Sequence, residues 1–328
     1  MSAPIPNNSP GPDLRVYKAP KRERWLQLRK ECVTSTEMAP VAGIPKYGNT
    51  SWSIYQEKRG DLEDTFDPNE RSEVGSIIEH GIAKLVSQRL GARVIRLRDF
   101  MVRGHVGASF DYHIQDPQSE YDGWLVEIKN VDYMIYRDQW SEDIHKRPIA
   151  PDHIGIQNQT QLEVARRPGV ILAALVGGND LKLGFVARDA EMGAALSKIA
   201  TDFWRRVEDG DAPPVVAEDA ANVPLVYKYA DPDNTMEASD QLTEDLREYK
   251  QLGGEIEELK ARRNTLKARV LEEIRDVSKV FAGDGLTLDA GVTAGSTGKE
   301  ITEDMVGQTI GARKSFRRFT VRQKKAVK

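Results

Sequence analysis

Apolar residues recur at helical spacing in three stretches near the start of the chain. Residues 21–31 ("KRERWLQLRKE") and 51–61 ("SWSIYQEKRGD") predict two helices separated by a segment rich in Gly, Pro, Ser and Thr. In residues 72–91, Val74, Ile77, Ile78, Ile82 and Leu85 share one helical face, and Gly91 ends the pattern. Strand-like segments follow at 92–97, 104–116 and 124–130.

The next hundred residues alternate in the same way. Residues 131–152 predict a long loop, whose Tyr133, Tyr136 and Trp140 either stack on an unpaired base or pack as a lid, and we favour packing. Residues 153–167 predict a helix, 169–178 and 181–189 predict two strands joined by a Gly-Gly-Asn-Asp hairpin turn, and 190–210 predict an amphipathic helix. This order indicates a mixed α/β fold with a buried central sheet.

The pattern changes beyond residue 214. From Leu242 to Val277, apolar residues recur three or four apart among Glu, Lys and Arg, which is typical of a long helix or helical hairpin with a coiled-coil-like seam. We predict a flexible leader at 1–20, a first domain at 21–214, a linker at 215–235, the helical segment at 236–281, and a small strand-rich segment with a basic tail at 282–328.

Composition narrows the class of protein. The 328 residues are 39% hydrophobic and 30% charged, and no apolar run approaches the ~20 residues of a membrane span. The first twenty residues lack the apolar core of a signal peptide, so we expect a cytoplasmic protein. A single cysteine, Cys32, excludes an intramolecular disulfide and a cysteine-based zinc cluster. We expect Cys32 to be a small buried residue rather than a nucleophile.

The net charge of −4 conceals a basic end. Residues 313–328 carry eight Lys and Arg residues and no acid, a composition that either forms a solvated tail or neutralises phosphates. The overall charge therefore leaves a nucleic-acid partner open.

The segment "LVEIKN" (125–130) contains the first candidate chemistry. Glu127 and Lys129 alternate with apolar residues and so point to one face of the strand. Such a pair is either a weakly stabilising surface pair or part of a metal-dependent site. Asp111 ends the preceding strand, so pairing of the two strands brings it close to Glu127. Glu79, on an otherwise apolar helix, is the third acid and is equally well explained by a wet face.

Three glutamines lie on the helix that crosses over these strands. Gln157 and Gln161 are four residues apart and share a helix face, whereas Gln159 points elsewhere. Glutamine is a good helix former, so solubility alone explains the run, but the side chains also suit contacts to the lysine or a phosphate. We find no zinc-ligand spacing around the five histidines, no phosphate-binding loop and no nucleophile elbow.

Taken together, these segments resemble a known family. Asp111, Glu127-Ile128-Lys129 and the preceding Glu79 are similar to the PD-(D/E)XK nuclease signature. More narrowly, "GSIIEHGIAKL", "GASFD", "LVEIKN" and "IQNQTQLEVA" resemble, in order, the YqaJ-type viral recombinases, phage-type exonucleases similar to that of phage lambda. The resemblance covers about residues 24–214.

The resemblance implies a role for each candidate residue. Glu79, Asp111, Glu127 and the carbonyl of Ile128 would hold Mg²⁺ or Mn²⁺, and Lys129 would activate or position the attacking water. Gln157, Gln159 and Gln161 match the family's glutamine-rich helix, and which of them touches Lys129 is open. Arg29, Thr34 and Ser35 match the region that holds a 5′-phosphate, although a surface arginine is the plainer explanation of Arg29. Tyr112 departs from the glycine that often follows the aspartate.

The sequence therefore predicts a restriction-endonuclease-like α/β core with a helical extension, acting as a Mg²⁺-dependent exonuclease that resects double-stranded DNA ends, 5′ to 3′, for recombination. The alternatives are a structure-specific or nicking endonuclease on the same site and a non-catalytic DNA-binding accessory protein. Candidate partners are DNA ends, a phage single-strand annealing protein and further copies of the chain in a ring, with no membrane. The expected location is the cytoplasm of a bacterial host, with a phage or prophage origin.

Overall fold

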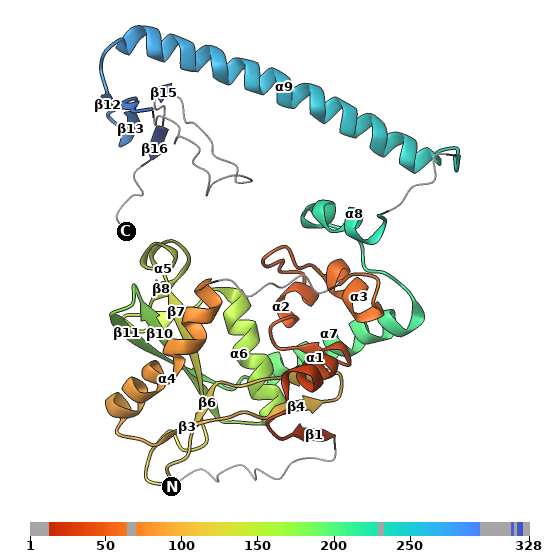
Figure 1. The fold of residues 1–328 in the computed structure, drawn as a ribbon, viewed down its shortest axis with the longest axis vertical. Helices are drawn as coiled ribbons and strands as arrows, with labels where there is room; N and C mark the ends of the chain where they lie inside the picture. Colours follow the sequence, from red (N-terminus) through yellow and green to blue (C-terminus); the bar gives the residue numbers. More distant parts are fainter. Residues whose placement is uncertain (1–12, 64–69, 229–232, 296–315, 318–319, 324–328) are drawn as a thin grey trace, which may run out of the picture. The chain divides into compact units, whose positions relative to one another are not determined.

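A computed structural model describes residues 13–63, 70–228, 233–295, 316–317 and 320–323 (Figure 1). The chain divides into two compact units, residues 1–231 and 232–328, and each is described by itself. None of the described helices is long and apolar enough to cross a membrane.

A five-stranded mixed sheet forms the centre of the first unit. Its strand order is β11-β10-β7-β6-β3, and β10 runs parallel to β7 while the other neighbouring pairs are antiparallel. The strands are β3 (Val94–Arg96), β6 (Tyr112–Ile114), β7 (Leu125–Val131), β10 (Gly169–Val176) and β11 (Asp180–Ala187). The turn between β10 and β11 uses Gly177 and Gly178, both at positive φ, as the predicted hairpin requires.

Helices cover both faces of this sheet (Figure 1). Helix α4 (Glu70–Leu90) packs its Ile82 and Val86 against Val126 and Ile128 of β7. On the opposite face, α6 (Asp152–Ala165) and α7 (Ala190–Asp209) pack in one cluster with Leu125. The mixed α/β fold class predicted from the sequence is therefore confirmed.

Strand β7 explains how an apolar strand carries charge at its centre. Its residues alternate, so Val126 and Ile128 face α4 while Leu125, Glu127 and Lys129 face the side of α6. Both faces are buried, and the charges of Glu127 and Lys129 are stabilised there because side chains of α6 form hydrogen bonds with them.

A second sheet, in the order β1-β4-β5-β2, stands beside the first. It contains β2 (Val33–Thr34), β4 (Phe100–Arg103) and β5 (Val106–Ala108), and α1 (Arg22–Lys30) leads into it. Its edge strand β1 (Leu14–Tyr17) corrects one prediction: these residues, assigned to a flexible leader, pair antiparallel with Phe100–Arg103. The alternation of apolar and polar residues in β1 is too short to predict a strand from the sequence, and only its pairing with β4 shows that these residues form one.

The segment after β7 is more ordered than a loop. It forms α5 (Tyr133–Gln139) and a small hairpin of β8 (Ser141–Glu142) and β9 (Pro148–Ile149). The rings of Tyr136 and Trp140 are buried and stacked with centroids 5.4 Å apart, so the expected packing is confirmed for both. Tyr133 differs, because it is 61% exposed.

The predicted linker also carries structure. Helix α3 (Ser51–Arg59) begins at Thr50, whose hydroxyl donates to Asp219 at 2.5 Å, and Asp219 is fully buried. Asp219 lies in the short helix η1 (Ala217–Ala221), and α8 (Val223–Val226) follows. The first unit therefore extends past residue 214, because a buried carboxylate needs the hydroxyl that Thr50 supplies. Helix α2 (Met38–Val41) completes this part of the unit.

The second unit contains one long helix rather than a helical hairpin. Helix α9 (Asp240–Ile274) is capped by the Ser239 hydroxyl and continues through Gly253-Gly254. Short strands follow: β12 (Lys279–Phe281), β13 (Leu286–Asp289), β14 (Val292–Thr293), β15 (Phe316–Arg317) and β16 (Thr320–Gln323). Apart from the backbones of β15 and β16, the basic tail lies outside the described residues.

Candidate active site

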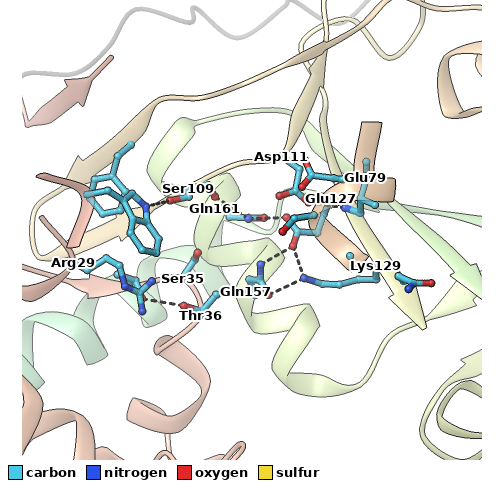
Figure 2. Close-up of a pocket in the computed structure, with 17 residues that line it drawn as sticks. Arg29, Ser35, Thr36, Glu79, Ser109, Asp111, Glu127, Lys129, Gln157 and Gln161 are labelled. Atoms are coloured by element: carbon cyan, nitrogen blue, oxygen red, sulfur yellow. Dashed lines mark hydrogen bonds and ion pairs between the residues drawn. The ribbon is translucent and has the colours of Figure 1, made fainter. Parts of the chain in front are cut away.

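A pocket of about 420 Å³ opens where the two sheets of the first unit meet. It brings together ten of the eleven predicted site residues, which are Arg29, Thr34, Ser35, Glu79, Asp111, Glu127, Ile128, Lys129, Gln157 and Gln161. Figure 2 shows the carboxylates and Lys129 on one side of this pocket and Arg29 on the other. The site therefore has an acidic part and a basic part.

Asp111 is held where the pairing of β6 and β7 stops. The last paired residues are Tyr112 and Val126, and beyond them the Asp111 carboxylate accepts the backbone N–H of Ile128 at 2.8 Å. The side chain thus takes over a donor that the diverging backbone leaves free. Asp111 is thereby fixed beside the centre of β7, as the predicted strand pairing requires.

Glu127 is the best-connected side chain of the pocket. Its carboxylate, 3% exposed, accepts from Gln157 Nε2 at 2.7 Å, from Gln161 Nε2 at 2.8 Å and from Lys129 Nζ at 2.6 Å. Lys129 Nζ also donates to Gln157 Oε1 at 3.4 Å. Gln157 is therefore the glutamine that contacts Lys129, whereas Gln161 donates to Glu127.

The pocket concentrates negative charge in a buried place. Burial, with the charge of Glu127 added, raises the pKa of Asp111 to about 8. Burial by itself lowers the pKa of Lys129, but the carboxylates of Glu127 and Asp111 outweigh it, so the pKa is raised overall. Lys129 is consequently an ammonium at neutral pH, a hydrogen-bond donor and not a base.

Glu79 lies at the edge of this group. It comes from α4, is half-buried, and pairs with Arg96 at 3.7 Å. Burial raises its pKa, the charge of Arg96 lowers it and that of Glu127 raises it further, so Glu79 shares the field of the site. Within the described ranges, no three His, Cys, Asp or Glu side chains are grouped closely enough to hold a metal on their own.

The basic part of the pocket is built around Arg29. Its guanidinium lies over the ring of Trp25, 4.8 Å from the centroid, and forms an ion pair with Glu37 at 3.1 Å. The buried Lys58 ammonium links Glu37 to the backbone of Arg29, since it donates to the Glu37 carboxylate at 2.7 Å and to the Arg29 carbonyl at 2.6 Å. The Arg29 guanidinium is thus held at the pocket wall with N–H groups left over for a ligand.

Comparison with known proteins places this part of the chain in a family. Residues 24–168 match the family model of the YqaJ-like viral recombinase domain. The segment is a YqaJ-like viral recombinase domain. A Bacillus subtilis protein named YqaJ, described as uncharacterized, is 23% identical over 268 residues, which are 80% of this chain and 81% of that protein.

Solved structures with a similar fold also exist. An alkaline exonuclease from Laribacter hongkongensis is 17% identical with a TM-score of 0.43, over 57% of this chain and 93% of that one. A phage-related exonuclease from Haemophilus somnus is 14% identical with a TM-score of 0.38, over 55% of this chain and 96% of that one.

One predicted residue does not belong to the pocket of the YqaJ-like domain. Gln159 turns to the other side of α6, where Nε2 donates to the Ala187 carbonyl at 2.9 Å and Oε1 accepts from the Asp189 backbone at 2.9 Å. It fixes the connection between β11 and α7. We therefore withdraw Gln159 as a site residue, since a side chain two positions from Gln157 and Gln161 cannot share their helix face.

The pocket also contains residues that sequence reasoning missed. Trp25 supports Arg29 and donates its indole N–H to Ser109 Oγ at 2.8 Å, and Thr36 places an exposed side chain beside Thr34, with the two hydroxyl oxygens 3.1 Å apart. Thr34 and Ser35 are buried, so Thr36 is the more accessible hydroxyl of the three. The "TST" triplet is the only signal in the sequence that could have drawn attention to it.

Proposed function

We propose that this chain is a divalent-metal-dependent deoxyribonuclease that resects double-stranded DNA ends from the 5′ side and leaves single strands for recombination. The observation that carries the proposal is the single pocket in which Asp111, Glu127 and Lys129 face Arg29 and its neighbouring hydroxyls. One part of such a pocket suits phosphodiester hydrolysis, and the other suits a terminal phosphate.

The donor set fits a hard cation. Mg²⁺ takes octahedral oxygen ligands, typically one or two carboxylates with water and substrate phosphate filling the rest. Asp111 and Glu127 with the Ile128 carbonyl offer such a partial set, and Glu79 lines the same pocket. The raised pKa of Asp111 supports this fit, because burial and then the charge of Glu127 disfavour its ionised form, and a bound cation would offset both.

Each side chain has a separate task in the proposed reaction. A bound Mg²⁺ or Mn²⁺ would supply Lewis-acid activation of water and of the scissile phosphate. Lys129, protonated at neutral pH, would donate to the phosphate oxygens as negative charge builds up during hydrolysis. Gln157 and Gln161 would keep Glu127 oriented throughout, since both amides are already bonded to it.

The Arg29 corner would restrict the enzyme to DNA ends. A guanidinium with neighbouring hydroxyls binds a phosphate strongly, because its N–H groups form a planar fork. A 5′-phosphate seated on Arg29, Ser35 and Thr36 would place a nearby phosphodiester against the carboxylates. Thr34 would help to orient Thr36 through the hydrogen bond between their hydroxyl groups.

The wider setting follows from the same proposal. The substrate would be double-stranded DNA ends, and a phage single-strand annealing protein would bind the single strand that resection produces. Copies of the chain closing into a ring around DNA would make resection processive. The proposed location is the cytoplasm of a bacterial host, with a phage or prophage as the source of the gene.

The deciding experiment compares three DNA substrates with Mg²⁺ and with a chelator. These are linear duplex with a 5′-phosphate, the same duplex with a 5′-hydroxyl, and closed circular plasmid. We expect loss of linear DNA only, faster with the phosphate, and at least ~100-fold slower in Lys129→Met. Lys182→Met is the matched control, since Lys182 is paired to carboxylates and 22% exposed, against 27% for Lys129, but lies outside the pocket.

The alternative outcomes are equally clear. Cutting of the closed circle would replace the exonuclease with an endonuclease on the same residues. Equal activity in Lys129→Met and the unmodified chain would remove the pocket from the reaction. An absence of metal-dependent cutting on every substrate would leave a DNA-binding accessory protein.

A further inference from the structure

Helix α9 presents an apolar stripe that the second unit leaves uncovered. None of its residues is buried, and six large side chains three or four residues apart are exposed: Leu242, Leu246, Tyr249, Leu252, Ile256 and Leu259. Leu266 continues the stripe. Most helices in proteins are stabilised by packing an apolar face, so a helix of this length calls for a partner along the stripe.

The charges along α9 identify the partner. Residues 240–258 carry seven carboxylates and two basic side chains, whereas residues 260–274 carry five basic side chains and two carboxylates. The helix dipole explains such a bias only in the first and last turns, and this asymmetry spans both halves. A helix that is acidic in one half and basic in the other is complementary to a second copy of itself running in the opposite direction.

The stripe is consistent with that pairing. If two copies cross at Gly254, Leu252 faces Ile256, Tyr249 faces Leu259 and Leu242 faces Leu266, because the two residues of each pair lie equally far from the centre. Arg263 interrupts the stripe, and the same centre places it against Asp245, a carboxylate that can pair with the guanidinium. A parallel pair would instead set Arg263 against Arg263 and acidic half against acidic half.

We propose that α9 is a dimerisation helix, which pairs with α9 of a second copy of this chain as an antiparallel coiled coil centred on Gly254. The assembly is independent of the nuclease site, and it brings two YqaJ-like domains into one particle. Along the acidic half, nucleic acid is excluded as an occupant, since phosphates would meet seven carboxylates.

Sedimentation equilibrium of the full chain tests the dimer. Without DNA, the expected mass is twice the 36.7 kDa of one chain, since the proposed ring closes around DNA. Leu259→Glu with Leu266→Glu should raise the dimer dissociation constant at least ~100-fold, because each dimer would bury four unpaired carboxylates. The matched control is Ala261→Glu with Ala268→Glu, which adds the same charge to the opposite face of α9 and should leave the dimer intact.

Disulfide trapping tests the direction. Leu242→Cys and Leu266→Cys proteins should form a crosslinked dimer when mixed and oxidised, and neither should crosslink alone. The native Cys32 is buried, and the unmodified chain serves as the control for it. A monomer at micromolar concentration, an assembly unaffected by the two glutamates, or crosslinking of Leu242→Cys alone would each overturn the proposal. DNA cleavage measured on the same variants reports separately on the proposed function.

Discussion

The side-chain amide of Gln161 donates to Glu127 Oε2 at 2.8 Å and so joins α6 to the centre of β7. The same nitrogen also donates to the Ser109 carbonyl at 3.1 Å, just before Asp111. One buried glutamine therefore connects the helix, the acidic strand and the loop that carries the second carboxylate. Because Gln157 holds the other oxygen of Glu127, this carboxylate is oriented before any metal or DNA arrives.

Replacing Gln161 with alanine should slow DNA cleavage by roughly 10–100-fold, in line with the loss of a residue that orients a metal ligand. Gln159→Ala is the control, because it removes the same amide from the same helix but outside the pocket. Both variants should lose about 1–3 kcal/mol of unfolding free energy, since each leaves buried groups without a partner. Cleavage rates per folded molecule, with urea unfolding alongside, measure the two effects. A Gln159→Ala rate as low as that of Gln161→Ala would contradict the assignment.

The Arg29 corner makes a prediction about substrate preference. Arg29→Gln should remove the advantage of a 5′-phosphorylated end, a loss of about 1.5–3 kcal/mol or roughly 10–150-fold in kcat/KM. Cleavage of 5′-hydroxyl ends should change little. Arg24→Gln, on the same helix, removes a side chain that pairs with the exposed Glu31 and does not line the pocket, so this variant should behave like the unmodified chain. Retained phosphate preference in Arg29→Gln would rule out this corner as the phosphate site.

Glu37 makes the stability of the domain depend on pH. Burial raises its pKa, but Lys58 and Arg29 outweigh burial, so the pKa lies below its usual value of 4.5. The ionised form is therefore favoured by folding, and its contribution is complete above about pH 4.5 and is lost as the pH falls further. Glu37→Gln should cost about 3–5 kcal/mol at pH 7, because it leaves Lys58 buried without its carboxylate.

The measurement is denaturant unfolding of the unmodified chain and Glu37→Gln at pH 7 and pH 4. The difference between them should shrink at the lower pH. Glu31→Gln removes an exposed acid nearby and should change stability by less than about 1 kcal/mol at either pH. A difference that stays constant with pH would mean that Glu37 acts through packing and not through its charge.

Cys32 should be chemically silent in the folded protein. Burial raises the pKa of its thiol to about 12, although the charge of Lys58 opposes the shift. Since the thiolate is the reactive form, a disulfide reagent at pH 8 should react at least ~100-fold more slowly with the native chain than with the guanidinium-unfolded chain. Fast reaction in the native state would show that the α1–β2 corner opens readily.

The sequence by itself determined the residues that lie close together along one element. Alternation in "LVEIKN" predicted that Glu127 and Lys129 share a face, and helical spacing predicted that Gln157 and Gln161 share one without Gln159. Both predictions hold because strand and helix periods are local properties of the backbone. The order of the elements was enough to predict the mixed sheet that places Asp111 beside β7.

Only the tertiary structure decided the contacts between distant parts of the chain. Trp25 meets Ser109, Thr50 meets Asp219, and residues 14–17 find their strand partner at 100–103. Nothing in the spacing of these residues foretells such pairs, because each depends on how separate elements pack and not on a backbone period. The same packing turned Gln159 toward β11 and α7 and made Thr36 the accessible hydroxyl beside Arg29. Local periodicity therefore specified the acidic part of the pocket, and long-range packing specified the basic part.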